Sequence, residues 1–476
     1  MLDLIIKNAI VLTMAGKGVG LIEDGAVGIK DDTIVVVDES ITVSKNYKAE
    51  REIDAKGKVV LPGFINVHCH SYYGVMCRGI LTDLEFFLEE GLAGYTDTLD
   101  IEKGIAGSKA HILEGIKHGT TTFGDMGSNY DMIAKVHDEF GTRARVCEYI
   151  RELPWNISDM LEGDYKFDRK YAEAGIKAMM NLLNTYGVDP ENRISAMVCF
   201  QALDYISEEL IIELREIARS HNAMIHTHLS QSPFEVEQAI KRFGMRPVDV
   251  FEKLGILNEN TLAAHLVYNT PEENKKTAES GVKMACCPSS WGEVGVVPPV
   301  AQFLDAGGIV GIGSDEAAYT GVNPAQDMKI SYILSNIDAY TNKKNFITMS
   351  TALRLQTIEA AKALGIGNVV GSLEPGKKAD VIIINPDVIN LTPVLLSPLT
   401  NIPQNIVSTA TGNEVETVII DGKIIMEDFE IKTFDERKVI DDAQKLGQEA
   451  AEDAAAYFKK LKKSEVLDRQ RWFKEN

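Results

Sequence analysis

Several features of exported and membrane-spanning proteins are missing from this sequence. No uncharged apolar run reaches the roughly 18 residues that a membrane-spanning helix needs. The N-terminal stretch MLDLIIKNAIVLTMAGKG lacks the basic region, long apolar segment and small-residue cleavage site of a secretory signal. The 6 cysteines form no C-x-x-C pair and no disulfide framework, which favours reduced, buried thiols. We expect a cytoplasmic protein that does not bind membranes.

Positive charge is scarce relative to negative charge. The chain of 476 residues has 49 Lys and Arg against 70 Asp and Glu, which gives a formal net charge of -21. An acidic surface repels a polyanion and releases no counterions on contact, so the charge disfavours nucleic-acid binding. Hydrophobic and charged residues make up 45% and 25%, as in ordinary globular proteins. A small-molecule substrate is therefore the expected partner.

Two distant parts of the chain have the same β texture. Residues 1–60 alternate apolar and polar positions in short runs such as LIIKNAIVL and TIVVVD, and residues 367–427 repeat this in VETVIIDGKIIMED. We expect one small β domain built from both segments. From about Asp435 the sequence reads as a charged helix, so residues 428–476 are interpreted as a helical extension that is solvated or bridges subunits.

Between these segments, short apolar runs rich in β-branched residues alternate with amphipathic helical stretches. Examples are AMIHTHL followed by PFEVEQAIKRFG, and ISAMVCF followed by SEELIIELREIARSH. Repeated β-then-α units predict an α/β protein with a parallel sheet, either open or closed. We favour a (β/α)8 TIM-like barrel over residues 61–366, because chemically active residues follow the strand-like runs, and in such barrels that rim carries the chemistry.

The first of these residues are His68 and His70, which end the run VVLPGFINVHCH. Residues two apart in a strand face the same side, so both rings can reach one ion. Alone, an H-x-H pair is a weak indication, because two ordinary polar residues produce the same pattern.

His228 and Asp315 strengthen the case, because each also closes an apolar run, in AMIHTHLSQ and GIVGIGSD. Imidazole nitrogen and carboxylate oxygen suit Zn²⁺ or Fe²⁺, and three or four such ligands describe a catalytic site. A buried hydrogen-bonded His or a helix-capping Asp is the alternative for each. His226 shares the strand face of His228, so periodicity alone leaves open which of the two is the ligand.

His265, which ends TLAAH, is a candidate for a role beside the metal, as a proton acceptor or as a stabiliser of an oxyanion. Five of the 9 histidines occupy strand-end positions. The other four lie on helix-like stretches, where surface or packing roles are the default: His111, His118, His137 and His221.

The segments VVLPGFINVHCH, GTTTFGDM, HLSQ, AAHLVY, GIGSD and GSLEPGKKADVIIIN closely resemble the amidohydrolase superfamily in order and separation. The nearest branch contains S-adenosylhomocysteine and guanine deaminases and the triazine hydrolases that remove chloride or amino groups. The resemblance extends to about residue 427. It implies a (β/α)8 barrel with a β-sandwich from both chain ends, and a homodimer or higher homo-oligomer.

The resemblance also implies a site. It assigns His68, His70, His228 and Asp315 as ligands of one divalent ion, Zn²⁺ first and Fe²⁺ as the alternative, and makes His226 a supporting residue. In related enzymes a metal-activated water attacks an electron-poor ring carbon and the ligand Asp takes its proton.

Two departures from the family pattern concern proton transfer and substrate. Gln231 stands where the deaminases have a Glu that shuttles a proton, and an amide cannot titrate. Glu316 is the obvious replacement, with a solvent-facing Glu as the alternative. Gln201 stands where many relatives carry a His that contacts substrate. Substrate identity is therefore not carried over from the commonest members.

Further residues are expected to line the pocket. Trp291, in CCPSSWGEVGVVPPV, could stack on a flat heterocycle or simply pack its loop. Tyr72, Tyr73 and Arg78 follow the first two ligands and are expected to line the pocket, with core and salt-bridge roles as alternatives.

The leading hypothesis is a metal-dependent hydrolase that deaminates an amino-substituted N-heterocycle, namely a purine, pteridine, pyrimidine or triazine. Loss of chloride or an alkylthio group, or opening of a cyclic amide, is the alternative, because a halide needs no proton to leave. A non-catalytic binding protein is a third hypothesis, against which the complete ligand set argues.

Overall fold

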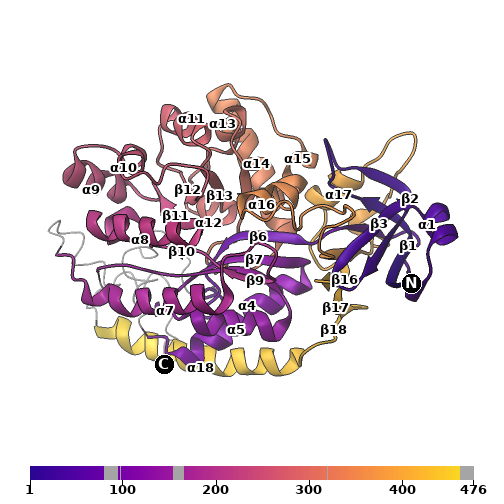
Figure 1. The fold of residues 1–476 in the computed structure, drawn as a ribbon, viewed down its shortest axis with the longest axis horizontal. Helices are drawn as coiled ribbons and strands as arrows, with labels where there is room; N and C mark the ends of the chain where they lie inside the picture. Colours follow the sequence, from indigo (N-terminus) through magenta and orange to yellow (C-terminus); the bar gives the residue numbers. More distant parts are fainter. Residues whose placement is uncertain (80–94, 97, 154–165, 319, 461–476) are drawn as a thin grey trace.

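The structure, a computed structural model, describes residues 1–79, 95–96, 98–153, 166–318 and 320–460 (Figure 1). Strands and helices alternate along much of the chain, so the α/β class expected from the sequence is confirmed. The N-terminal strands and the strands from the C-terminal part lie side by side at one end of the molecule, beside the region where helices surround the remaining strands (Figure 1).

Both ends of the chain contribute to one nine-stranded sheet. Its order is β18-β17-β16-β15-β5-β1-β2-β3, and β4 pairs with β1. The two ends meet where β15 runs antiparallel to β5. The strands are β1 (Leu2–Leu12), β2 (Leu21–Lys30), β3 (Thr33–Glu39), β4 (Ala49–Asp54), β5 (Val59–Pro62), β15 (Val381–Ile384), β16 (Val415–Ile420), β17 (Lys423–Glu427) and β18 (Glu430–Ile431). The helix α1 (Ser40–Asn46) connects β3 to β4.

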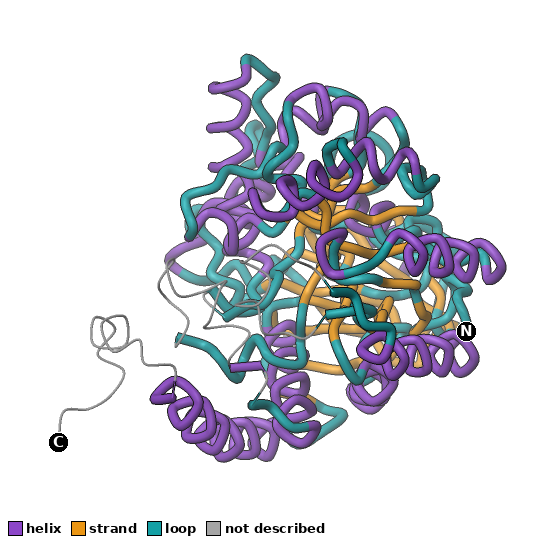
Figure 2. The backbone as a smooth tube through the Cα atoms, turned by 90° about the vertical axis from the view of Figure 1, so that its left-hand side faces the viewer, coloured by secondary structure: helices purple, strands orange, loops and turns teal. Residues whose placement is uncertain are grey.

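The other strands form two parallel sheets, of order β6-β7-β8-β9 and β10-β11-β12-β13-β14. A single residue, Met197, separates β9 from β10, and an isolated parallel bridge pairs Cys69 with Asp315. The strands are β6 (Phe64–Cys69), β7 (Thr120–Gly127), β8 (Arg143–Glu148), β9 (Ile194–Ala196), β10 (Val198–Cys199), β11 (Ile225–Leu229), β12 (Thr261–His265), β13 (Lys283–Cys286) and β14 (Val310–Ile312). Figure 2 shows strands in the interior with helices around them.

Several helices begin at a residue whose side chain caps the first turn. The side chains of Ser207 and Ser232 accept hydrogen bonds from the first turns of α8 and α9, and Thr270 and Glu273 form a capping box at α11. The helices are α4 (Ile101–Lys117), α5 (Tyr130–Phe140), α7 (Lys170–Tyr186), α8 (Glu208–His221), α9 (Pro233–Phe243), α10 (Pro247–Lys253), α11 (Pro271–Glu279), α12 (Pro288–Glu293), α13 (Val300–Asp305), α14 (Pro324–Asn342), α15 (Met349–Leu355), α16 (Ile358–Ala363), α17 (Ile402–Ser408) and α18 (Glu436–Lys460). Short 3-10 turns cover η2 (Leu203–Tyr205) and η3 (Ile389–Leu391).

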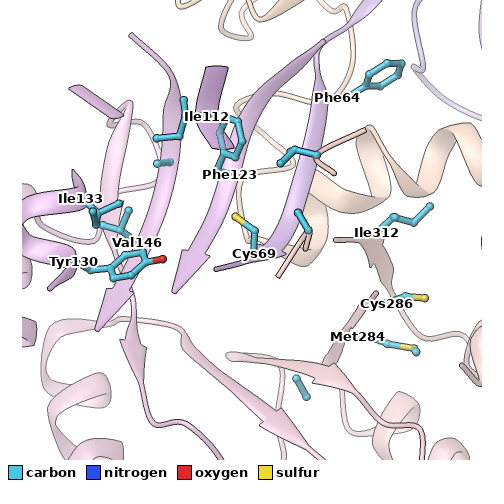
Figure 3. Close-up of a cluster of buried hydrophobic side chains, with 14 of the residues drawn as sticks. Phe64, Cys69, Ile112, Phe123, Tyr130, Ile133, Val146, Met284, Cys286 and Ile312 are labelled. Atoms are coloured by element: carbon cyan, nitrogen blue, oxygen red, sulfur yellow. The ribbon is translucent and has the colours of Figure 1, made fainter. Parts of the chain in front are cut away.

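The parallel strands are buried along nearly their whole length, as expected when helices cover them. Phe64, Ile112 and Phe123 belong to the largest buried cluster, part of which Figure 3 shows. This packing holds the carboxyl ends of the strands close together, and those ends carry the candidate site residues.

A buried ion network joins the β8 strand to the nine-stranded sheet. The Arg143 guanidinium donates to Asp380 from Nε (2.9 Å) and to Asp421 from a terminal nitrogen (2.7 Å). Asp380 precedes β15 and Asp421 follows β16, and Arg143 is 1% exposed. Two carboxylates therefore neutralise one guanidinium at the junction.

The C-terminal helix α18 packs against α4 (Figure 1). The helix expected from about Asp435 is present from Glu436 to Lys460, whereas the expected continuation through 461–476 lies outside the described residues. None of the helices described here has the length and apolar character needed to cross a bilayer.

Candidate metal centre

Four imidazoles and one carboxylate from four different strand ends meet at one place. The ring of His68 lies 4.7 Å from that of His70, 5.0 Å from that of His228 and 5.4 Å from that of His265, between centroids. Asp315 Oδ1 lies 3.7 Å from Nε2 of His68 and 3.2 Å from Nε2 of His70. Its Oδ2 lies 4.0 Å from Nε2 of His265. The structure thus brings together side chains that are almost 250 residues apart.

Main-chain contacts hold Asp315 beside the two histidines of β6. The amide of Asp315 donates to the carbonyl of His68 (3.0 Å), and the amide of His70 donates to the carbonyl of Asp315 (3.2 Å). Gly313 permits this approach, because a Cβ there would lie 2.6 Å from the carbonyl oxygen of His68. Asp315 has a positive φ of 56°, a conformation that is uncommon outside glycine and often found at functional sites.

The Nδ1 atoms of His70 and His228 each face a carbonyl oxygen. His70 Nδ1 lies 2.8 Å from the carbonyl of Met126, and His228 Nδ1 lies 2.5 Å from the carbonyl of Gln201. A carbonyl oxygen only accepts, so each Nδ1 carries the proton of the neutral ring. The lone pair at each Nε2 is therefore available for a metal ion, a common arrangement for histidine ligands.

The Nδ1 atom of His68 faces another histidine, His226, instead of a carbonyl oxygen. His68 Nδ1 lies 2.9 Å from Nε2 of His226, whose own Nδ1 lies 3.7 Å from Sγ of Cys147. Both nitrogens of His226 are therefore engaged behind His68. Nε2 of His68, in contrast, is buried without a hydrogen-bond partner among the described residues. Of the two histidines that the sequence left open, His228 offers a ligand atom to the cluster and His226 supports His68.

These residues fit one divalent cation. Nε2 of His68 and Oδ1 of Asp315 are both buried and lack a hydrogen-bond partner within the described part of the chain. Ligand atoms of His68, His228 and His265 lie within 4.8 Å of one another, as do those of His70, Asp315 and Glu316. An ion bound between imidazole nitrogens and a carboxylate would satisfy the orphaned atoms, and this donor set suits Zn²⁺ or Fe²⁺.

The charge state of the cluster also suits a cation. Burial lowers the pKa of His68 and His228, so both rings are neutral and able to act as ligands at neutral pH. Burial also lowers the pKa of His265, to about 3. Burial opposes the ionisation of Asp315, but the surrounding imidazoles, with His265 first, hold its pKa well below its usual value. Asp315 is therefore the anionic member of the cluster.

Glu316 also belongs to the cluster. It is buried, and Ser290 Oγ lies 3.4 Å from its Oε2. Burial, with the negative charge of Asp315 beside it, raises the pKa of Glu316 well above its usual value. The alternative of a solvent-facing Glu316 is wrong, and the pKa values of the two adjacent carboxyls are shifted in opposite directions.

Gln231 and Gln201 are tied to the site through their main chains. The amide of Gln231 donates to Oε2 of Glu235 (2.8 Å), a fully buried carboxyl on the first turn of α9. Gln201 supplies the carbonyl that receives His228, and its buried Oε1 has no partner in the described structure. Both glutamines thus lie in loops that directly flank His228.

Trp291 contacts His265 directly. Its indole Nε1 lies 2.8 Å from Nδ1 of His265, and the two rings are T-shaped with centroids 5.2 Å apart. Trp291 is buried at 8% exposure, in the short helix α12. Its polar edge is therefore occupied by a histidine of the cluster.

Tyr72 and Arg78 are not brought to the cluster. The chain turns immediately after His70, and Tyr72 donates its hydroxyl to the carbonyl of Asp100, before α4. The guanidinium of Arg78 pairs with Glu114 on α4. The turn directs both side chains towards α4, which spacing along the sequence does not reveal.

Two aromatic residues pack around His70: Tyr73, which was expected to line the pocket, and Tyr149, which the sequence analysis missed. The Tyr149 hydroxyl lies 3.0 Å from Nδ1 of His70, and Tyr73 stacks on the same ring at 5.5 Å. Tyr149 follows β8 directly, so its strand-end position was a usable signal.

Asp125 was also missed, although it lies in the GTTTFGDM segment. Its Oδ1 accepts from the amide of Ser71 (3.1 Å) and the hydroxyl of Tyr130 (2.7 Å), and its Oδ2 lies 3.1 Å from Nε2 of His137. Burial opposes its ionisation, but the bond to His137 and other contacts lower the pKa of Asp125 to about 2. Asp125 therefore anchors the backbone directly after His70.

Comparison with known sequences gives one family and several close relatives. A family model described as the amidohydrolase family matches residues 59–425. The 5-methylthioadenosine/S-adenosylhomocysteine deaminase of Moorella thermoacetica is 31% identical over 440 residues, which cover 92% of this chain and 97% of that protein. The 5'-deoxyadenosine deaminase of Methanosarcina mazei is 32% identical over 456 residues, which cover 94% and 98%.

Solved structures share the fold. An adenosine deaminase from Xanthomonas campestris with bound zinc superposes with a TM-score of 0.85 at 23% identity, over 94% of this chain and 99% of that one. The atrazine chlorohydrolase TrzN from Arthrobacter aurescens TC1, complexed with zinc, gives a TM-score of 0.81 at 22% identity, over 93% and 100%.

Proposed function

Because the chain belongs to the amidohydrolase family, we propose that it is a metal-dependent hydrolase that removes the amino group of an N-heterocycle, with adenosine derivatives as the first substrates to test. Relatives that match over nearly their whole length are named as deaminases of such compounds. The observation that carries the proposal is the convergence of the imidazoles of His68, His70 and His228 with the carboxylate of Asp315, and Glu316 beside it.

The residues that would hold the ion are His68, His70, His228 and Asp315, with Zn²⁺ as the first candidate and Fe²⁺ as the alternative. When bound, such an ion acidifies a water molecule and so provides the nucleophile at neutral pH. The shared use of Nδ1 for a supporting hydrogen bond favours this ligand set, because it orients each ring. At His70 and His228 the carbonyl partner also leaves Nε2 unprotonated.

Asp315 and Glu316 then carry out different proton transfers, one as the first acceptor and the other as the first donor. Asp315 accepts a proton as the water oxygen bonds to the ring carbon that bears the amino group. The protonated Glu316 donates to the neighbouring ring nitrogen, a task that Gln231 cannot perform because an amide does not titrate. The proton on Asp315 passes to the amino group, which leaves as ammonia. The remaining water proton returns to Glu316 as the ring carbonyl forms.

We infer a closed (β/α)8 barrel over residues 61–366 and a β-sandwich from residues 1–60 and 367–427, with 428–476 as an extension. The Cys69–Asp315 bridge and the single residue between β9 and β10 support closure. The mixed sheet built from both chain ends supports the sandwich. A homodimer or higher homo-oligomer and a cytoplasmic location stay part of the proposal.

Removal of chloride or an alkylthio group is the second candidate function. It is favoured by Gln231, because a halide departs without a proton. Glu316 favours deamination instead, since burial and the charge of Asp315 raise its pKa and so suit it to supply the proton that Gln231 cannot.

Ammonia release from a panel of aminated heterocycles tests the proposal. The zinc-loaded protein should release one ammonia per product from at least one of 5'-deoxyadenosine, methylthioadenosine, S-adenosylhomocysteine, adenosine, guanine or an aminotriazine. Chloride release from chlorinated analogues, with no ammonia from any amine, would replace the proposal with the second candidate.

A further inference from the structure

His265 differs from the neighbouring histidines in what its Nδ1 atom faces. The Nδ1 atoms of His70 and His228 face the carbonyl oxygens of Met126 and Gln201, which can only accept a hydrogen bond. His265 instead has the indole Nε1 of Trp291 at 2.8 Å from its Nδ1. The two kinds of partner require opposite tautomers.

An indole nitrogen donates a hydrogen bond and cannot accept one. Nδ1 of His265 must therefore keep its lone pair to receive the Trp291 proton. A neutral imidazole carries one proton, so in His265 that proton sits on Nε2. This is the nitrogen that lies 4.0 Å from Oδ2 of Asp315, facing the cluster.

We propose that Trp291 is a positioning residue that fixes His265 as a hydrogen-bond donor at Nε2. The inference deepens the proposed function and rests on it for the oxygen that this N–H meets. A protonated Nε2 cannot bind a cation and cannot take a proton from water. His265 therefore stands outside the ligand set, although its ligand atom lies within 4.8 Å of those of His68 and His228.

The tautomer also decides between the two roles expected for His265, proton acceptor and stabiliser of an oxyanion. Proton acceptance is excluded because the only free lone pair, at Nδ1, points at Trp291 and away from Asp315. Donation to the oxygen that develops negative charge is what the remaining N–H can do.

Both partners are held in place from their own sides. His265 ends β12 with a positive φ of 84°, and Leu266 follows with a φ of 58°. The amide of Leu266 donates a hydrogen bond to the carbonyl of Leu229 (3.0 Å). On the other side, the amide of Val296 donates a hydrogen bond to the carbonyl of Trp291 (2.9 Å). The Tyr268 ring packs edge-on against the indole, with 6.3 Å between the ring centroids. The donor and acceptor thus meet between two fixed loops.

The test reads the tautomer directly. Zinc-loaded protein labelled with ¹⁵N in the histidine rings is observed by NMR at neutral pH, and His265→Gln identifies the His265 signals. In the wild type, Nδ1 of His265 should appear unprotonated and Nε2 protonated. Trp291→Phe, which keeps a ring but removes the donor, should shift the Nδ1 signal and introduce the other tautomer.

Tyr268→Phe is the matched control, since it alters the ring beside the indole without touching the bond to His265. It should leave the His265 signals unchanged. Trp291→Phe should keep the zinc stoichiometry and lower kcat by about tenfold, the range of one lost hydrogen bond. A wild-type His265 protonated at Nδ1, or unchanged His265 signals in Trp291→Phe, would overturn the inference. Failure of the proposed function would appear differently, as a protein with the expected tautomer that deaminates nothing.

Discussion

Nδ1 of His68 lies 2.9 Å from Nε2 of His226, and this contact separates the roles of two histidines that share one face of β11. Both ring nitrogens of His226 have partners, Nε2 contacting His68 and Nδ1 contacting Cys147. His228, two residues later, keeps Nε2 available because its Nδ1 is bound to the carbonyl of Gln201.

This division predicts different metal binding by two neighbouring variants. His228→Ala should lose the metal during dialysis, because it removes one of the proposed ligands. His226→Ala should retain it with an affinity about 10- to 100-fold weaker, as expected when a partner of a ligand is removed. Metal analysis and titration with a competing chelator measure both. Equal losses in the two variants would contradict the assignment.

Asp315→Ala should abolish turnover, because it removes the ionised carboxylate that we propose accepts the proton of water. Activity above a few per cent of wild type, with metal still bound, would refute the role of Asp315. Asp387→Ala, which removes an exposed carboxylate away from the cluster, serves as the control and should retain full activity.

The relation between Glu316 and Gln231 predicts a rescue. Glu316→Gln should lower kcat for deamination by about 100-fold or more, because it removes a general acid. Adding Gln231→Glu in the same protein should restore part of the rate, since it returns a titrating group next to His228. If Glu316→Gln leaves ammonia release unchanged, the ring nitrogen receives its proton from another group.

Removal of the metal should lower the melting temperature, because an ion that binds only the folded chain stabilises it. A ligand present at 1,000 times its Kd contributes about 4 kcal/mol to stability. Differential scanning fluorimetry with a chelator, followed by added Zn²⁺, measures the loss and its recovery. The His228→Ala protein should respond far less to either addition.

Arg143→Met should lower the free energy of unfolding by about 3–5 kcal/mol, because it leaves the buried carboxylate of Asp380 without its counter-charge. Denaturant unfolding measures this change. Arg437→Met breaks an exposed pair with Asp441 and should change stability by no more than about 0.5 kcal/mol. A comparable effect of both substitutions would contradict the importance of burial at Arg143.

The cluster could be found from sequence because strand periodicity and strand ends are local properties. His68 and His70 share a face by their spacing, and the run before Asp315 marks where a strand stops. The ambiguity between His226 and His228 could not be resolved in the same way. It depends on which carbonyl or ring lies opposite each Nδ1, and those partners are up to 158 residues away.

Substrate contacts were harder to predict because they depend on the direction of loops. Tyr72 and Arg78 follow His70 closely in sequence, yet the turn after β6 sends them to α4. For Trp291 the sequence left open whether the ring stacks on substrate or packs its loop. Its bond to His265 joins two loops whose separation no sequence pattern specifies.

The sheet that joins both chain ends has a consequence for synthesis on the ribosome. Val59–Pro62 is made early and pairs with β1, but its other neighbour, Val381–Ile384, emerges only after more than 300 further residues. At ordinary translation rates this wait lasts on the order of tens of seconds. Throughout that time the nascent chain presents an unpaired strand edge, which can pair with strands of other chains. Chaperone binding to this edge would prevent such pairing.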